Sequence, residues 1–271
     1  MPDERSTHPS KIRRLLGDGD PSPVTVINPA GRSPFLLIGD HAGNAIPNAL
    51  GTMGLTEDDR HRHIAWDIGT AQLGAELART LDATFIHQHY SRLVIDCNRA
   101  PDRVDAIPET SDGSAISGNV GLTADDRACR IDEVHEPYQR AIADAIEARV
   151  GVRDTILVSL HSFTPHMGGV DRPWHIGVLH DGAKDRFAIE MLRNLAARQD
   201  LNVGDNEPYV MDETDYTVPR HAYPCDLPYV ELELSQAALT IPGGMAHWSQ
   251  IIASTLLASL GELEGFLDGK R

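Results

Sequence analysis

Short apolar runs alternate along the chain with longer segments of helical periodicity. Runs such as 35–38 and 156–160 are apolar at nearly every position, which is typical of strands covered on both faces of a parallel sheet. The segments between them carry apolar residues at intervals of three and four, which indicates helices with one buried face. The pattern predicts strands at 35–38, 83–87, 93–95, 156–160, 174–179 and 228–234. It predicts helices at 68–81, 123–150, 184–197 and 244–263.

The alternation of predicted strands and helices indicates an α/β fold. Strands connected through helices form βαβ units, and such units build a mostly parallel sheet. We therefore expect a single domain over 23–271, with a mostly parallel central sheet flanked by helices. Residues 1–22 are charged and contain Gly and Pro, which predicts a loosely ordered N-terminal arm. A polar stretch at 102–122, rich in Gly, Ser and Asp, predicts a long functional loop.

The net charge and the cysteines narrow the classes of protein. The 271 residues include 24 Lys and Arg against 40 Asp and Glu, a net charge of −16. Such a field repels nucleic acid and anionic membrane surfaces, so neither is an expected partner. We find no apolar run of the roughly 18 residues that span a bilayer, and no signal-peptide segment. Three isolated cysteines, Cys97, Cys129 and Cys225, indicate neither disulfides nor a thiolate zinc site. We expect a cytoplasmic protein, of an oligomeric state that the sequence leaves open.

Metal-binding and acid–base side chains stand at the ends of three predicted strands. His41 follows the strand at 35–38, His161 ends the strand at 156–160, and Glu233 lies in the last strand. The carboxyl ends of parallel strands share one crevice, so we expect these residues in a common site. The short motifs of serine hydrolases, dinucleotide-binding proteins, P-loop proteins and HExxH peptidases are absent.

The two strand-end histidines suggest a zinc site. Catalytic zinc takes its ligands from rigid elements and keeps one position open for water. His41 and His161 meet this requirement, and Asp67, at the start of a predicted helix, is the first choice for a third ligand. Each has a simpler alternative. His41 can be a turn residue, His161 a core histidine bonded to a carbonyl, and Asp67 an N-terminal helix cap.

Two glutamates in the last predicted strand are candidates for acid–base chemistry. Glu231 and Glu233 alternate with apolar residues and therefore face the same side of the strand. Buried carboxylates are rare unless they are paired or functional. Beside a metal site, Glu233 would act as the general base. The alternative for either glutamate is a structural ion pair with an arginine.

A basic cluster surrounds the apolar run at 93–95. Arg92 precedes it, and Asn98 and Arg99 follow it in the sequence DCNR. Guanidinium groups bind carboxylates through paired hydrogen bonds. On so acidic a chain, an arginine pair would attract an anionic substrate. Surface salt bridges are the alternative.

Five motifs resemble the N-formylglutamate amidohydrolase family. They are DHAGN at 40–44, AWDIG at 65–69, YSRLVIDCNR at 90–99, LHSF at 160–163 and YVELELS at 229–235. The resemblance extends over residues 24–262, and DCNR together with HSF is its most specific part. The family is similar to the zinc carboxypeptidases and aspartoacylases, so the resemblance implies a zinc-carboxypeptidase-like α/β fold and one catalytic zinc ion.

The resemblance also implies roles for individual residues. His41 and His161 would bind the zinc ion. Asn98 and Arg99 would bind a substrate carboxylate, and Glu233 would be the base.

Two positions depart from the pattern of these relatives. The carboxypeptidase-like motif HxxE has a glutamate where this chain has Asn44, so the carboxylate ligand must come from elsewhere, with Asp67 as the candidate. Members that act in histidine utilisation have proline where this chain has Asp40, which leaves the substrate within the family open.

These features predict a zinc-dependent amidohydrolase. We expect it to cleave the N-formyl or another N-acyl bond of a small amino-acid substrate that carries a carboxylate, such as N-formylglutamate. One alternative is a zinc peptidase or amidase acting on a larger acidic substrate, depending on whether 102–122 closes the cleft. The other is a metal-free carboxylate-binding protein on the same fold.

Overall fold

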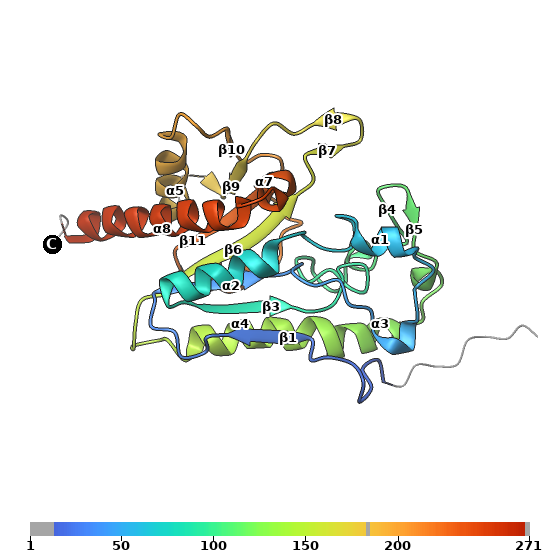
Figure 1. The fold of residues 1–271 in the computed structure, drawn as a ribbon. Coiled ribbons are helices and arrows are strands. Elements are labelled where there is room, and N and C mark those ends of the chain that lie inside the picture. The colour runs from blue at the N-terminus through green and yellow to red at the C-terminus, as the bar shows by residue number, and fades with distance from the viewer. Residues whose placement is uncertain (1–13, 183–184, 269–271) are drawn as a thin grey trace, which may run out of the picture.

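A seven-stranded mixed sheet forms the centre of the computed structural model, which describes residues 14–182 and 185–268 (Figure 1). The strand order is β1-β3-β2-β6-β11-β9-β10. The strands of the sheet are β1 (Val24–Ile27), β2 (Phe35–Gly39), β3 (Thr84–Gln88), β6 (Ile156–Phe163), β9 (Ile176–Leu179), β10 (Val203–Asp205) and β11 (Tyr229–Ser235). Two separate hairpins are formed by β4 (Thr110–Ser111) with β5 (Ser114–Ala115) and by β7 (His166–Met167) with β8 (Val170–Asp171).

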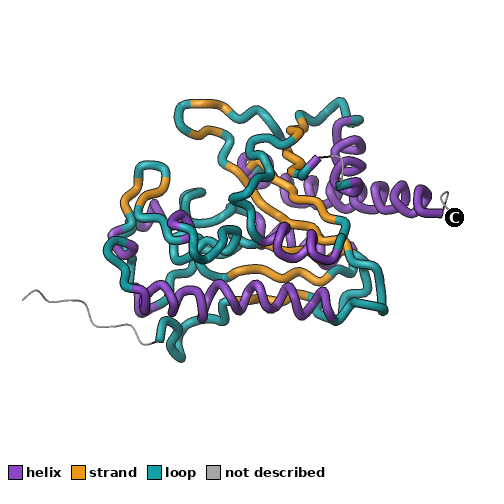
Figure 2. The backbone as a smooth tube through the Cα atoms, turned by 180° about the vertical axis from the view of Figure 1, so that it is seen from behind, coloured by secondary structure: helices purple, strands orange, loops and turns teal. Residues whose placement is uncertain are grey.

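Helices cover both faces of the sheet. The α-helices are α1 (Glu57–His61), α2 (Thr70–Leu81), α3 (Ala124–Arg130), α4 (Glu136–Glu147), α5 (Arg186–Ala196), α6 (Thr217–Ala222), α7 (Gln236–Thr240) and α8 (Gly244–Asp268). Short 3₁₀ turns are η1 (Asn48–Leu50), η2 (Val104–Ala106), η3 (Ser117–Asn119) and η6 (Tyr223–Cys225), and η4 (Ile131–His135) is π-helical. Helices α2, α5 and α8 pack on one face, and α4 and α6 pack on the other. Figure 2 shows α4 lying along the sheet from behind.

Three buried apolar clusters hold these layers together. The largest lies between the sheet and α2, α5 and α8, and the second lies between the sheet and α4 and α6. The third cluster lies outside the sheet, beneath the loops that follow the carboxyl ends of β2 and β3. These loops therefore have an apolar core of their own and form a fixed surface beside the strand ends.

The observed fold confirms a mostly parallel sheet flanked by helices in one domain. Strands β3, β2, β6 and β11 all run parallel to one another. The two edges differ from a fully parallel arrangement, because β1 is antiparallel to β3 and β9 is antiparallel to β11. β9 is buried at every position, and a buried strand is apolar in either direction, so its residues do not specify which way it runs.

The apolar run at 93–95 is not a strand, and that prediction was wrong. These residues form a turn that packs into the third cluster. Side chains satisfy its carbonyls instead of a neighbouring strand: Arg130 donates to Val94 O (2.8 Å), and Asn119 donates to Leu93 O (2.9 Å). Periodicity reports burial, and a buried turn with side-chain partners produces the same apolar pattern as a strand.

The predicted helices are present with changed ends. The helical segment predicted from Thr123 is divided into α3, η4 and α4, which follow one another without a break. Thr123 is the N-cap, and Asp126 completes a capping box. The prediction for 184–197 corresponds to α5, and residue 184 lies outside the described residues.

The predicted N-terminal arm falls partly within the described residues. Residues 1–13 lie outside them. Leu15 is buried in the third cluster, and its backbone N–H donates to Glu133 Oε1 at 2.7 Å. The segment from residue 14 is therefore in contact with the folded domain, and the boundary at 22 stays a prediction.

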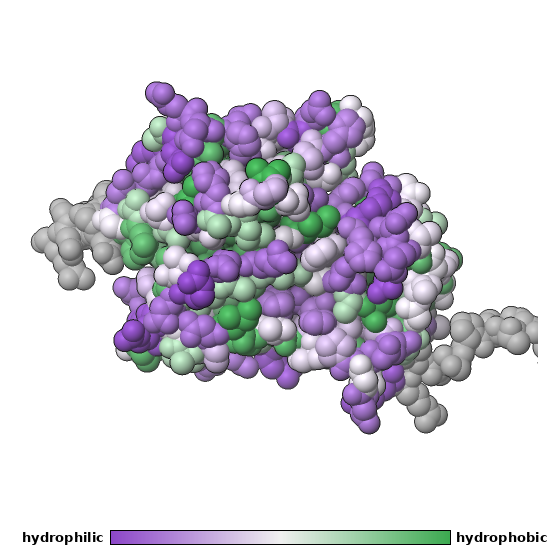
Figure 3. Space-filling view, in the orientation of Figure 1, coloured by the Kyte–Doolittle hydropathy of each residue, from purple (hydrophilic) through white to green (hydrophobic). Residues whose placement is uncertain are grey.

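The surface seen in the orientation of Figure 1 is mostly hydrophilic, with apolar residues in small groups (Figure 3). Among the described residues, no helix has the length and apolar character needed to cross a membrane.

Replacing Arg130 tests how the buried turn is held. Arg130 is 1% exposed and donates to Val94 O, Asn119 Oδ1 and Gly118 O. Arg130→Met keeps most of the volume but leaves these acceptors unsatisfied, which we expect to lower the free energy of unfolding by about 3 kcal/mol. Urea unfolding measures the change. The control Arg140→Met, at an exposed position of α4, should change it by less than about 0.5 kcal/mol. Equal losses in the two variants would contradict this account of the turn.

Candidate active site

A cavity of about 600 Å³ lies at the carboxyl ends of the parallel strands. His41 follows β2, His161 lies in β6, and Glu231 and Glu233 lie in β11. The remaining walls come from the segments at 63–67, 92–99, 105–112, 162–167 and 208–215. The strand ends thus form the floor, as expected for an open α/β sheet.

The turn after β2 brings His41 into this cavity. Gly43 lies against the backbone of the neighbouring segment, where an added Cβ would stand 2.0 Å from His89 O. Glycine is therefore required for this close approach. The carbonyl of His41 also accepts from the backbone N–H of Asp67 at 2.9 Å, which joins the first two motifs of the sequence.

His41, Asp67 and His161 are brought together at the floor of the cavity. Their potential ligand atoms all lie within 4.8 Å of one another, and all three side chains are buried. Asp67 Oδ2 lies 2.9 Å from His161 Nδ1 and 3.5 Å from His41 Nδ1. The alternative that Asp67 caps the N-terminus of a helix was wrong. The N-cap of α2 is Gly69, and no described side chain forms a capping hydrogen bond there.

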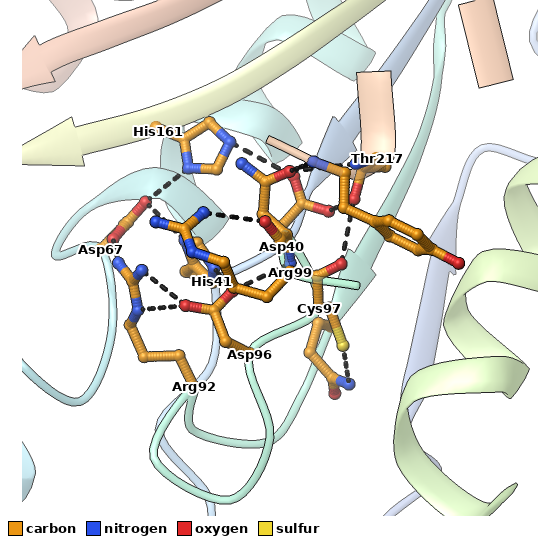
Figure 4. Close-up of polar contacts among 12 residues, drawn as sticks. Asp40, His41, Asp67, Arg92, Asp96, Cys97, Arg99, His161 and Thr217 are labelled. Atoms are coloured by element: carbon orange, nitrogen blue, oxygen red, sulfur yellow. Dashed lines mark hydrogen bonds and ion pairs between the residues drawn. The ribbon is translucent and has the colours of Figure 1, made fainter. Parts of the chain in front are cut away.

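Two further carboxylates hold the opposite nitrogens of the histidines (Figure 4). His41 Nε2 lies 2.7 Å from Asp96 Oδ1. His161 Nε2 lies 3.2 Å from Asp40 Oδ2 and 3.1 Å from Ser159 Oγ. Both Nδ1 atoms are therefore turned toward Asp67, and His41 Nδ1 has no hydrogen-bond partner among the described residues. This is the arrangement in which outer carboxylates orient histidine ligands of a metal ion.

Burial and charge act in opposite directions on these groups. Burial lowers the pKa of His41, but the carboxylates of Asp96 and Asp67 outweigh it and raise the pKa above its ordinary value. Burial also opposes protonation of His161, and its bonds to Asp40 and Asp67 raise its pKa well above the ordinary value. Burial raises the pKa of Asp67, but the two histidines outweigh it, and the pKa lies below its ordinary value. The cluster therefore favours an added positive charge, such as that of a metal cation.

Glu231 and Glu233 both face the cavity from β11, as their alternation predicts. Burial raises the pKa of Glu231 to about 8 and the pKa of Glu233 to about 7. Within the part of the chain that the structure describes, neither forms an ion pair with an arginine, so that alternative was wrong. Glu231 Oε1 lies 3.9 Å from His161 Nε2. Glu233 is opposite His161 in the sheet register and interacts electrostatically with Asp67 and His41.

The basic residues line the same cavity but already have partners. Arg92 donates through Nε and Nη2 to Asp96 Oδ2, at 3.0 and 2.6 Å. Arg99 donates through Nη1 to the carbonyls of Asn98 and Thr214, at 2.8 and 3.3 Å, and its Nε lies 3.4 Å from Asp105 Oδ2.

Asn98 connects the cavity to α6. Its Oδ1 accepts from the backbone N–H groups of Tyr216 and Thr217, at 2.9 and 3.0 Å. Its Nδ2 donates to Asp215 Oδ1 at 3.2 Å. The predicted contact of Asn98 with a substrate carboxylate stays a prediction, since both ends of its amide hold the segment before α6.

The loop predicted at 102–122 forms one wall of the cavity. It contains η2, the β4–β5 hairpin and η3, and four of its residues line the cavity: Asp105, Pro108, Ser111 and Asp112. A second wall, at 208–215, includes Tyr209, whose hydroxyl accepts from Arg172 Nη1 at 2.9 Å. Two ordered segments therefore limit the size of the space around the histidines.

Asp40 and Asp96 were not singled out as site residues from the sequence. Asp96 directly follows the apolar run at 93–95, Asp40 follows the run at 35–38 after one glycine, and each is buried at no more than 5% exposure. Since a buried aspartate requires a partner, their positions were a usable signal. Thr217, which donates to Asp40 Oδ1 at 2.6 Å, gave no such signal, because its approach depends on where α6 packs.

Solved structures resemble this fold. A gene product of Agrobacterium tumefaciens has 32% sequence identity and a TM-score of 0.89 over 93% of this chain and 100% of that chain. N-formylglutamate amidohydrolase from Ralstonia eutropha has 17% identity and a TM-score of 0.62 over 90% and 99% of the two chains. A metallo-carboxypeptidase from Burkholderia cenocepacia has 12% identity and a TM-score of 0.37 over 90% and 65%. No curated protein sequence matches the chain significantly.

A family model identifies the chain directly. The model described as N-formylglutamate amidohydrolase matches residues 33–240, which include all of the site residues named above. The match agrees with the motif resemblance and extends over most of the described fold. The chain therefore belongs to the N-formylglutamate amidohydrolase family, whose members hydrolyse amide bonds.

Proposed function

We propose that this protein is a zinc-dependent hydrolase of the N-acyl bond of small amino-acid derivatives, such as N-formylglutamate. The family supports amide hydrolysis. The observation that carries the metal dependence is the buried Nδ1 of His41, which has no hydrogen-bond partner among the described residues and faces Asp67 Oδ2, 3.5 Å away, beside the Nδ1 of His161. A buried polar atom without a partner is costly unless a ligand supplies one.

The donor set fits zinc. Two imidazole nitrogens and one carboxylate oxygen are ligand types that zinc prefers, and three protein ligands leave a position open in catalytic sites. His41, Asp67 and His161 would hold the ion. When bound, zinc supplies a Lewis acid for the acyl oxygen and lowers the pKa of water toward about 7.

Glu233 is proposed as the general base. Within the described ranges its buried Oε2 has no hydrogen-bond partner. Glu233 also interacts electrostatically with Asp67 and His41, whose ligand atoms form the cluster. Glu233 would accept a proton from the attacking water and deliver it to the amide nitrogen as the C–N bond breaks. Water then provides the hydroxyl group of the released acid and the hydrogen of the released amine.

Arg92 and Arg99 are proposed to attract the substrate carboxylate. Both guanidinium groups line the cavity, and their side chains are 28% and 23% exposed. Their partial exposure leaves donors accessible to a ligand. The walls at 105–112 and 208–215 favour a small substrate over an extended peptide.

The first test measures bound metal. His41→Ala and His161→Ala each remove a ligand from a three-residue set, so zinc content should fall well below one per chain while circular dichroism stays near the parent. His166→Ala, at an exposed histidine of β7, serves as the matched control and should keep its zinc. Full zinc occupancy in both site variants, measured by elemental analysis, would favour the metal-free binding protein instead.

The second test separates carboxylate binding from catalysis. Arg99→Ala should lower kcat/KM for an acid substrate, because a desolvated charge pair is lost. The expected loss corresponds to about 2–5 kcal/mol of transition-state binding free energy. The loss should be smaller for the corresponding carboxamide. Arg103→Ala removes a neighbouring arginine that is paired with Asp105 but does not line the cavity, and it should affect both substrates little. Equal losses for acid and amide in Arg99→Ala would mean that this residue does not bind the carboxylate.

The third test concerns the base. Glu233→Gln keeps the shape of the side chain but cannot accept the water proton, so kcat should fall about 10²-fold or more with zinc still bound. Glu231→Gln should act chiefly on stability and lower kcat far less. Steady-state kinetics at saturating zinc compare the two variants. If Glu231→Gln is inactive and Glu233→Gln is near the parent, then Glu231 is the base.

A further inference from the structure

Arg172 differs from the other arginines near the cavity in having no paired carboxylate. Arg92 and Arg99 each lie within ion-pair distance of an aspartate. Among the described residues, the side chain of Arg172 contacts only Tyr209, through a hydrogen bond and a cation–π contact. A guanidinium without a counter-ion keeps further N–H donors and its charge available for an anionic ligand.

The β7–β8 hairpin places Arg172 at the rim of the cavity. The backbone N–H of Arg172 donates to the carbonyl of Pro165 at 2.8 Å, which closes the base of the hairpin. Thr164 and Met167, on the strand that leads into the hairpin, line the cavity. The charge of Arg172 also acts on His63, which lines the cavity from another wall. Arg172 does not itself line the cavity, so its guanidinium lies just behind the lining residues.

Tyr209 connects this charge to the cavity. Tyr209 lines the cavity from the wall at 208–215 and is 41% exposed. Arg172 Nη1 donates to the hydroxyl oxygen of Tyr209 at 2.9 Å, and Arg172 Cζ lies 4.8 Å from the centroid of its ring. The hydrogen bond fixes the oxygen and the cation–π contact fixes the ring, so Arg172 holds Tyr209 in one orientation.

The hydroxyl hydrogen of Tyr209 has no acceptor among the described residues. The hydroxyl oxygen accepts from Arg172, which leaves the O–H free to donate. Burial raises the pKa of Tyr209 above its ordinary value, so the hydroxyl stays protonated. A carboxylate that accepted this hydrogen would also lie within reach of Arg172, because Arg172 Nη1 is 2.9 Å from the same oxygen.

Charges of the catalytic region act on the same hydroxyl. Tyr209 interacts electrostatically with Glu233, the proposed base, and with Arg92. A ligand held at the histidine cluster can therefore extend to Tyr209. The charge of Glu233 opposes a further anion there, and the charges of Arg92 and Arg172 favour one. Of these three groups only Arg172 bonds to the hydroxyl, so its charge acts at the shortest range.

We propose that Tyr209, positioned by Arg172, binds a second carboxylate of the substrate, in addition to the one assigned to Arg92 and Arg99. This inference rests on the proposed function and adds a specificity-determining residue to it. The second carboxylate stands either at the end of the amino-acid side chain or at the end of the acyl group. The recognition is the same in both cases, and the experiment has one arm for each.

Two matched pairs of substrates test the preference. N-formylglutamate and N-formylglutamine differ in the charge at the end of the side chain. N-succinylalanine and its terminal carboxamide differ in the charge at the end of the acyl group. All four keep the α-carboxylate. We expect kcat/KM to be about 10-fold higher for the acid than for the amide in at least one pair, which identifies the source. No preference for the acid in either pair would overturn the proposal.

A tyrosine variant locates the preference. Tyr209→Phe keeps the ring and removes the O–H donor, so the ratio of kcat/KM for acid and amide should fall about 10-fold, to near unity. Tyr223→Phe makes the same change at a tyrosine that is 42% exposed and does not line the cavity, and it should leave the ratio unchanged. An equal loss for acid and amide in Tyr209→Phe would mean that Tyr209 does not bind the second carboxylate.

Variants of Arg172 test its role as a positioning residue. Arg172→Met removes the charge and should abolish the preference for the acid. Arg172→Lys keeps the charge without the planar fork and should retain a preference of about 3-fold. Arg140→Met, at an exposed position of α4, should leave the preference unchanged. A parental preference in Arg172→Met, or equal losses in Arg172→Met and Arg172→Lys, would contradict this role.

Equilibrium binding separates this inference from the proposed function. Free glutamate and glutamine, and free succinate and succinamate, are products of the four reactions and are titrated into the zinc-loaded protein by calorimetry. In at least one pair the acid with the second carboxylate should bind about 10-fold more tightly than its amide, and Tyr209→Phe should remove the difference. If no N-acyl amino acid is hydrolysed, the proposed function fails, and the binding order still decides the role of Tyr209. If the substrates are hydrolysed but neither acid binds more tightly than its amide, the role of Tyr209 fails and the hydrolase remains.

Discussion

The buried carboxylate of Asp67 is the constraint on which the site depends. It lies between His41, which follows β2, and His161 of β6, and its backbone N–H donates to the carbonyl of His41. A carboxylate at 4% exposure is tolerated only with partners of opposite charge or donor character. The two histidines supply these partners, and Asp40 and Asp96 in turn hold the histidines from behind. The ring orientations are thus fixed by packing and hydrogen bonds before any ligand arrives.

Much of the fold was predictable because burial is recorded in the order of apolar residues. The strands β2, β3 and β11 were found within one residue, β6 extends three residues beyond its predicted end, and the carboxyl ends of these strands indicated where the site would lie. The direction of β9 was not predictable, since a buried strand has the same composition either way. β1 is only partly buried and was not predicted as a strand. The turn at 93–95 was mistaken for a strand because Arg130 and Asn119, distant in sequence, satisfy its backbone.

The candidate site shows the same division. His41, Asp67, His161 and Glu233 were predicted from strand ends and motifs, and the structure places them at one cavity. The partners that orient them were missed, because a hydrogen bond between side chains from separate elements leaves no local pattern.

The reversed direction of β9 affects how the rim of the cavity can change. Because β9 is antiparallel to β11 and β11 is parallel to β6, β9 begins at the end of the sheet where β6 finishes. The connection between β6 and β9 therefore stays at the carboxyl end of β6. It carries the exposed β7–β8 hairpin, which projects away from the sheet in Figure 1. Such a connection does not cross either face of the sheet, so its length can change without disturbing the helices packed there. Insertions or deletions in this hairpin can therefore reshape the entrance for substrates of different size while the floor of the cavity stays in place.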